Sequence, residues 1–129
     1  MLVLNRRIGE TICIGNDTSV TVYDKLRYHV TMGVIAPPAM AVLYGEMRLR
    51  PAILPDGERF YMISLLNSEA FRIGDVELQV GFTPSYLSSG NARKRQVRIS
   101  IDAPQSVTVH REEIYLQQLE RAGKQRPSI

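Results

Sequence analysis

The fold is decided by the first third of the chain, residues 1–44, MLVLNRRIGETICIGNDTSVTVYDKLRYHVTMGVIAPPAMAVLY. Short runs rich in β-branched and aromatic residues alternate here with turn-forming residues, which is typical of consecutive β-strands. The pattern predicts five strands, over residues 2–7, 11–14, 20–23, 29–34 and 40–44. The turns fall at Gly9-Glu10, Gly15-Asn16-Asp17 and Pro37-Pro38. This third of the chain therefore predicts a meander of five strands.

A second series of strands follows in the same order. It is predicted over residues 60–66, 70–73, 76–80, 96–101 and 107–110. Single residues repeat as well, since Ile14-Gly15-Asn16 matches Ile73-Gly74-Asp75, and Ala36-Pro37 matches Ala103-Pro104. One hairpin loop of the second copy, residues 81–96, is enlarged relative to its counterpart. The chain is expected to hold two copies of one five-stranded module.

The segment between the copies is rich in turn-forming residues. Pro51 and the sequence Pro55-Asp56-Gly57 indicate a linker of limited flexibility. We therefore divide the chain into a first module at 1–48, a linker at 49–58 and a second module at 59–125.

The second module is expected to end in a helix that the first module lacks. This helix is predicted over about residues 111–122, because Glu112 and Glu113 face the helix dipole in its first turn and Gly123 follows its end.

Composition sets limits on the class of protein. With 129 residues, 44% of them hydrophobic, the chain can bury one compact core but not two independent full-size domains. The net charge of +3 alone is weak support for a nucleic-acid partner. A single cysteine, Cys13, and the lack of a signal-peptide core or membrane-length apolar run favour a cytoplasmic protein. No catalytic grouping or phosphate loop is found, so no enzyme, cofactor or metal site is expected.

Both ends of the chain carry motifs of one known family. Residues 1–11, MLVLNRRIGET, followed by Ile14-Gly15, closely resemble the opening strand and turn of the carbon storage regulator (CsrA/RsmA) family. Ala103-Pro104 and residues 109–115, VHREEIY, resemble the second signature of that family. Together the two copies cover nearly the whole chain.

The resemblance implies a fold and a partner. Members of the family form intertwined homodimers, in which strands one and five of each subunit insert into the sheet of the other. They bind GGA motifs in hairpin loops of mRNA leaders or small regulatory RNAs. For this chain the resemblance implies an all-β, single-chain pseudo-dimer with one shared core and a short C-terminal helix. It also implies a monomeric RNA-binding regulator of translation.

Each copy keeps one half of the family's RNA-binding signature and departs from the other half. The second copy has Leu65 and Leu66 at the positions of the Arg-Arg pair, and the first copy has Leu43-Tyr44-Gly45 in place of His-Arg-Glu. If the modules exchange strands as the subunits do, one complete site results, from Leu4, Arg6, Arg7, Val109, His110 and Arg111. The opposite edge, with Tyr44, Leu65 and Leu66, offers no cation for phosphate or base oxygens and is expected to be degenerate.

Three features allow a second interpretation. The pair Arg6-Arg7 could serve only to block strand-on-strand aggregation, although arginine's planar fork also suits guanine and phosphate. The run Arg93-Lys94-Arg95 in the enlarged loop is either a solvated charge cluster or a source of additional phosphate contacts. The apolar residues of the degenerate edge could instead bind a protein, such as an antagonist or an ordinary family member, or they could have a structural role and be buried under the linker. The alternative function is therefore a non-RNA-binding interaction protein.

Overall fold

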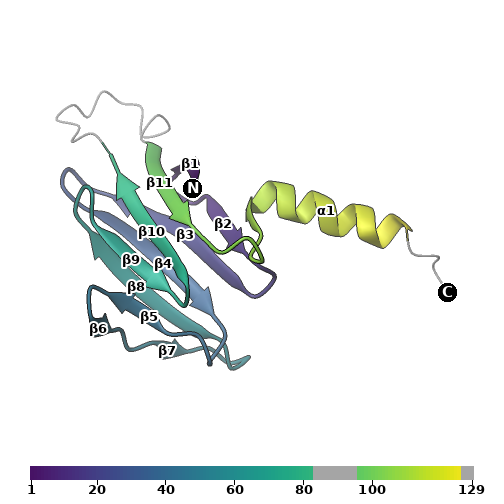
Figure 1. Ribbon diagram of the computed structural model, residues 1–129, viewed down its shortest axis with the longest axis horizontal. Coiled ribbons are helices and arrows are strands. Elements are labelled where there is room, and N and C mark those ends of the chain that lie inside the picture. The colour runs from purple at the N-terminus through teal and green to yellow at the C-terminus, as the bar shows by residue number, and fades with distance from the viewer. Residues whose placement is uncertain (83–95, 126–129) are drawn as a thin grey trace.

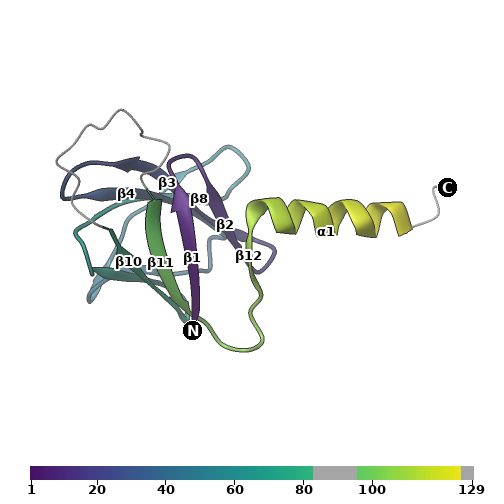
Figure 2. The ribbon, with the colours of Figure 1, turned by 90° about the horizontal axis from the view of Figure 1, so that it is seen from above.

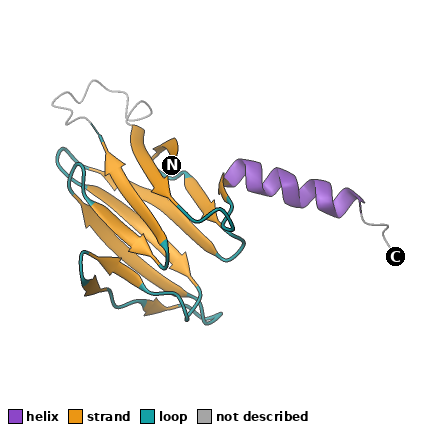
Figure 3. Cartoon of the chain, in the orientation of Figure 1, coloured by secondary structure: helices purple, strands orange, loops and turns teal. Residues whose placement is uncertain are grey.

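The computed structural model describes residues 1–82 and 96–125, and the described chain is mostly β-strand (Figure 3). The strands of the first half are β1 (Leu2–Arg7), β2 (Thr11–Ile14), β3 (Thr18–Lys25), β4 (Val30–Ala36), β5 (Val42–Tyr44), β6 (Met47–Arg48) and β7 (Ala52–Ile53). The second half contains β8 (Arg59–Leu65), β9 (Ala70–Ile73), β10 (Val76–Gly81), β11 (Gln96–Asp102), β12 (Val109–Arg111) and the helix α1 (Glu112–Gln125).

The strands form two antiparallel sheets that exchange strands between the two halves of the chain. Sheet A has the order β1-β11-β10-β9-β5-β6, and sheet B has the order β12-β2-β3-β4-β8-β7. The three central strands of sheet A come from the second half and are flanked by β1 and β5 from the first. Sheet B has the converse arrangement, with β8 and β12 flanking strands of the first half (Figure 1). The expected single-chain pseudo-dimer is confirmed.

One hydrophobic core lies between the two sheets. Strands such as β10 alternate buried and exposed residues, as expected for a sheet with one face on the core and one in water. The largest fully buried side chains of the core include Phe71, Ile12, Met32, Leu65 and Leu78, which come from both halves of the chain. Neither half could bury these side chains alone, so the halves fold as one unit.

Two short strands lie at or within the segment predicted as a linker. β6 pairs with β5 at the end of sheet A, and β7 pairs with β8 at the end of sheet B. The sequence pattern predicts neither strand. They extend the two sheets on the side of the molecule opposite to β1 and β12.

The helix leaves the body of the protein. It begins directly after β12, and Figures 1 and 2 show it projecting from the sheets, with the C-terminus at its far end. Leu116 and Leu119 are about half exposed, since only the first turns lie near the sheets. No helix among the described residues is long and apolar enough to cross a membrane.

The predicted elements agree with the structure apart from their bounds. All ten predicted strands are present, and the helix predicted at 111–122 begins one residue later and extends to Gln125. The enlarged loop joins β10 to β11, as predicted. Arg93, Lys94 and Arg95 lie outside the described residues, so their role stays a prediction.

Candidate nucleic-acid interface

Strands β1 and β12 form neighbouring edges of the two sheets. β1 is the end strand of sheet A, beside β11, and β12 is the end strand of sheet B, beside β2. Figure 2 shows both strands close to the start of α1. The exchange of strands thus brings the beginning of the chain to its last strand. An edge strand presents backbone donors and acceptors that no neighbouring strand uses, so it can bind a ligand directly.

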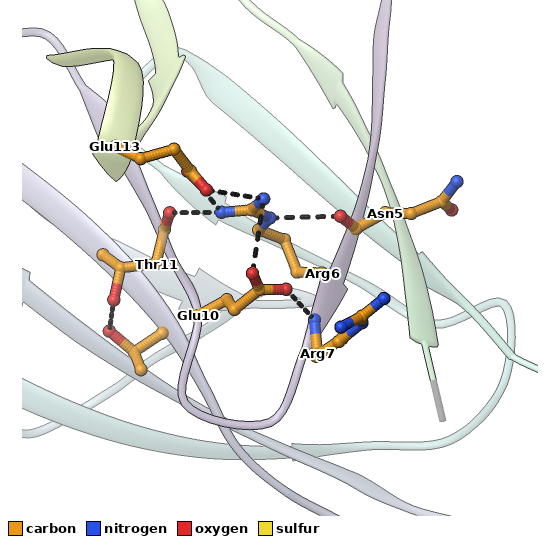
Figure 4. A network of polar contacts seen from close by, with 7 residues as sticks. Asn5, Arg6, Arg7, Glu10, Thr11 and Glu113 are labelled. Atoms are coloured by element: carbon orange, nitrogen blue, oxygen red, sulfur yellow. Dashed lines mark hydrogen bonds and ion pairs between the residues drawn. The ribbon is translucent and has the colours of Figure 1, made fainter. Parts of the chain in front are cut away.

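Arg6 joins these two edges through a buried guanidinium group. Its Nη1 and Nη2 atoms donate to the two carboxylate oxygens of Glu113 at 2.8 and 3.2 Å (Figure 4). Nη1 also donates to the Thr11 carbonyl oxygen at 3.2 Å, and Nη2 lies 3.7 Å from Glu10 Oε2. Arg6 is only 5% exposed, so these oxygens replace water around its charge. Glu113 is the second residue of α1, and the ion pair therefore holds the β12–α1 junction against β1.

The same contact changes the acidity of Glu113. The hydrogen bonds from Arg6 lower the pKa of the Glu113 carboxyl group, and a hydrogen bond from its own backbone acts in the same direction. The positive charges of Arg6 and Arg111 lower it further, whereas partial burial opposes the shift.

Strand β1 directs its two arginines to opposite faces. Leu4 and Arg6 are buried, whereas Asn5 and Arg7 are exposed, because side chains alternate along a strand. The backbone N–H of Arg7 donates to Glu10 Oε1 at 2.7 Å, and its side chain extends away from that of Arg6 (Figure 4). The Arg7 guanidinium makes no hydrogen bond or ion pair within residues 1–82 and 96–125.

Strand β12 also divides its residues between two faces. Val109 lines a groove of about 300 Å³ between the start of β1 and the segment that precedes β12. Arg111 is exposed, and its guanidinium has neither ion pair nor hydrogen bond in the described part of the chain. His110 instead lines a separate cavity of about 590 Å³, together with Tyr115 of α1.

The opposite pair of edges can be compared residue by residue through the strand register. Arg6 on β1 lies opposite Val97, and Leu65 on β8 lies opposite the corresponding Val30. Leu65 therefore occupies the position of Arg6, and Leu66 occupies that of Arg7. On the other strands, Val109 faces Ile14 and Val42 faces the corresponding Ile73. This register makes Tyr44 the counterpart of Arg111.

The counterpart edge carries different chemistry on the same backbone. Leu65 is fully buried in the core, and Leu66 is 47% exposed. The Leu66 N–H donates to Glu69 Oε1 at 2.7 Å, as that of Arg7 does to Glu10. The Tyr44 hydroxyl donates to Glu69 Oε2. The turn carboxylate of this edge thus accepts from a neutral hydroxyl, whereas that of Glu10 lies 3.7 Å from the Arg6 guanidinium.

This hydrogen bond affects both partners. It lowers the pKa of Glu69, with a smaller contribution from the Leu66 N–H, and it raises the pKa of Tyr44. β6 and β7 lie beside β5 and β8, so the Tyr44 edge differs from the Arg6 edge in strand cover. The exposed Arg48 of this edge comes from β6, opposite Leu43, and not from the positions of Arg6, Arg7 or Arg111.

The structure brings the predicted site residues of β1 and β12 to one side of the molecule, but with different surroundings. Arg7 and Arg111 are exposed, Arg6 is buried in an ion pair, and His110 lines the other cavity. Glu113, the partner of Arg6, was predicted only as a helix-start charge. The two residues are 107 positions apart, and no local sequence pattern links them.

Comparisons with known proteins identify two matching segments. The CsrA model, described as a global regulator protein family, matches residues 1–50 and 90–120. The first segment contains β1 and the second contains β12 and most of α1, whereas the unmatched stretch contains β8 with Leu65. No solved structure matches the chain.

One curated relative is the protein named translational regulator CsrA from Syntrophomonas wolfei subsp. wolfei. It is 38% identical over 48 residues, which cover 37% of this chain and 63% of the relative. The match therefore spans less than two thirds of the relative's own length.

Proposed function

The chain belongs to the CsrA global regulator protein family, and we propose from this that it regulates translation by binding RNA through one composite site at the β1–β12 edge. The proposed targets are GGA motifs in hairpin loops of mRNA leaders or small regulatory RNAs. The proposed site consists of Leu4, Arg6, Arg7, Val109, His110 and Arg111.

The observation that carries this proposal is the difference between the two edges. At the β1–β12 edge, the exposed guanidinium groups of Arg7 and Arg111 make no hydrogen bond or ion pair within the described residues, and Arg6 ties β1 to the first turn of α1, which follows β12. At the other edge, Leu66 and Tyr44 stand at the equivalent positions. An arginine fork can bind a phosphate or the O6 and N7 atoms of guanine with two hydrogen bonds, and a leucine or tyrosine cannot.

The burial of each residue supports a division of roles within the site. Arg7 and Arg111 would contact phosphate or guanine, and Val109 would form part of the wall of the groove at the start of β1. Arg6 would act as a positioning residue, because its guanidinium is committed to Glu113 and the Thr11 carbonyl. His110 would support the site from the opposite face of β12.

A single site has consequences for regulation. A protein with two sites can hold two hairpins of one RNA and gains roughly 10²–10⁴ in avidity through effective concentration. A monomeric chain with one site cannot bridge hairpins. The protein would therefore repress a restricted set of messages with single strong hairpins, or compete with two-site relatives for such hairpins.

The test is a binding titration by fluorescence anisotropy with a short hairpin carrying GGA in its loop. A hairpin of the same stem with CCA in its loop is the matched control. We expect saturable binding to the GGA hairpin and at least a tenfold loss with the CCA hairpin, because each lost base contact costs about 1–3 kcal/mol. Equal affinity for both hairpins, or no binding to either, would rule out the proposed function.

A further inference from the structure

A polar groove lies on the outer face of sheet A, next to the exposed side of β1. It has a volume of about 480 Å³ and lies near the β10 end of the enlarged hairpin. Most of its lining side chains are amides or a cation, from Asn5, Asn67, Gln96 and Arg98, and the remaining lining residues are Ser68, Gly81 and Phe82. Amide side chains can donate and accept hydrogen bonds at once, which suits the edges of unpaired bases.

Arg98 is the exposed cation of this groove. It lies directly opposite Asn5 on one side and Gly81 on the other. A Cβ atom on Gly81 would be 3.8 Å from Arg98 Nε, so the arginine side chain lies over the bare backbone of this glycine. Arg98 forms no hydrogen bond or ion pair with any other described residue. Its charge is therefore available to a ligand.

The groove is continuous with the proposed RNA-binding edge. Arg7 and Asn5 both point to the outer face of β1, and Arg7 pairs with Gln96 while Asn5 pairs with Arg98. Arg7 and Arg98 are thus diagonal neighbours, at roughly 7–8 Å between Cα atoms for such a pair. The acidic residues of this face, Glu77 and Asp102, lie opposite each other at the far end of β10 and β11. Arg7 and Arg98 thus lie at the end of the sheet that borders the groove, whereas Arg72 of β9 lies opposite Glu77 at the far end.

Sheet B provides an internal comparison, because its strands pair as those of sheet A do, apart from a β-bulge in β3 between Val22 and Asp24 that β10 lacks. The row Asn5, Arg98 and Gly81 in sheet A corresponds to Ser64, Thr31 and Asp24 in sheet B. That row has no arginine, and an acidic side chain stands where Gly81 leaves space. The cationic groove therefore occurs beside the arginine-bearing edge and not beside the leucine-bearing edge. This correlation favours a ligand shared by the edge and the groove.

We propose that the groove binds the single-stranded nucleotides that adjoin the GGA motif held at the β1–β12 edge. Arg98 contacts a phosphate, and the amides of Asn5 and Gln96 bind base edges or ribose hydroxyls. Asn67 offers its amide N–H groups, because its Oδ1 accepts from the Phe82 N–H at 2.9 Å. Phe82 is almost fully buried, with the Lys25 ammonium 5.1 Å from its ring centre, so it forms a wall of the groove and does not stack on a base. The inference rests on the proposed function, because it extends the same RNA beyond the edge site.

The experiment uses the full chain and three hairpins with one stem. The first has a minimal loop with GGA, and the other two have uridines added on the 5′ or the 3′ side of GGA. Arg98→Ala removes the cation, and Gly81→Val fills the groove at a strand position whose φ is not in the left-handed region. Arg72→Ala is the control, because Arg72 is an exposed arginine in the same sheet, on β9, outside the groove.

We expect one extended hairpin to bind the native chain more tightly than the minimal hairpin. Arg98→Ala should weaken that hairpin by about tenfold and lower the slope of log affinity against log salt by about one, because one phosphate contact is lost. Gly81→Val should also remove the extra affinity for the extended hairpin, whereas Arg72→Ala should keep it. The minimal hairpin should bind every variant with an affinity within about twofold of that for the native chain.

Other outcomes overturn the inference and separate it from the proposed function. If the minimal hairpin binds and neither extension nor Arg98→Ala changes the affinity, the groove does not bind RNA while the edge site stands. An equal loss in Arg98→Ala and Arg72→Ala would show general electrostatic attraction and no groove. If no GGA hairpin binds the native chain, the proposed function fails and the groove inference fails with it.

Discussion

Arg6 of the first strand and Glu113 of the C-terminal helix form a two-pronged ion pair at 2.8 and 3.2 Å. At the equivalent place on the other edge, Leu65 replaces the arginine, and the turn carboxylate of Glu69 accepts from the Tyr44 hydroxyl instead. The equivalent turn carboxylates, Glu10 and Glu69, thus have different partners: Glu10 forms an ion pair with Arg6, and Glu69 accepts from Tyr44. Within the described residues, the Arg6 edge is the one that links sheet A to α1 by an ion pair.

This ion pair should stabilise the fold as a coupled unit. Glu113→Gln is expected to lower the free energy of unfolding by about 1 kcal/mol, because hydrogen bonds to a charged group are lost but the Glu113 side chain is half exposed. Arg6→Met should lower the free energy of unfolding further, since it also removes the hydrogen bond to the Thr11 carbonyl oxygen. Urea unfolding of both single variants and the double variant measures the coupling. Strict additivity of the two costs would contradict the pairing.

The acid stability of the protein should depend on the same carboxylate. The pKa of Glu113 is lower in the folded protein than its ordinary value of 4.5, so the ionised group contributes stability above that value. This contribution is lost as the pH falls below about 4.5 and through the folded pKa. Urea midpoints measured from neutral to acidic pH should therefore fall more steeply for the native chain than for Glu113→Gln. Some dependence should remain in the variant, because Glu69 also has a lowered pKa. Parallel curves for the two proteins would exclude this role of Glu113.

Arg7 and Arg111 should affect RNA binding without affecting stability. Replacing either by Ala is expected to weaken GGA-hairpin binding by roughly 1–3 kcal/mol while leaving the unfolding curve unchanged, because both side chains are exposed. Arg48→Ala is the matched control, since Arg48 is an exposed arginine on β6, at the opposite edge. A loss with Arg48→Ala as large as that with Arg7→Ala would point to net charge instead of a site.

The turn between β8 and β9 should be open to stabilisation. Ser68 has φ of 71°, in the left-handed region, where its counterpart in the first copy is Gly9 with φ of 88°. Ser68→Gly should raise the free energy of unfolding by about 0.5–1 kcal/mol, because it relieves backbone strain at some cost in chain entropy. Gly9→Ser should do the opposite, since a Cβ atom there meets nothing within 4 Å and only the backbone strain changes. Thermal unfolding of both variants checks the pair. A less stable Ser68→Gly would refute this assignment of strain.

Much of the fold could be predicted from the sequence because its signals are local. Alternating apolar residues and glycine turns placed ten strands and the helix with small errors in their bounds. The exchange of strands followed from the family resemblance of the two ends and not from periodicity. The short strands β6 and β7 were missed because two-residue strands carry no alternation, and they form only where β5 and β8 present an edge.

The residues of the candidate site could be predicted from the sequence, but which of them are buried and which are exposed could not. The family motif predicts the same RNA-binding role for Arg6 and Arg7, whereas the structure buries the side chain of Arg6 and exposes that of Arg7, because side chains alternate along a strand. The partner of Arg6 depends on where α1 begins in space, which no local pattern encodes. No sequence signal points to Arg98, because an isolated arginine on a predicted strand is usually a solvated side chain.

The most direct test of the single-site pseudo-dimer is the number of RNA molecules bound per folded chain. A calorimetric titration of the purified protein with a GGA-loop hairpin gives this number, with the mass of the protein and of the complex determined in parallel by light scattering. We expect one hairpin bound to one monomeric chain. Two hairpins per chain, or a dimer that binds two hairpins through exchanged strands, would contradict it.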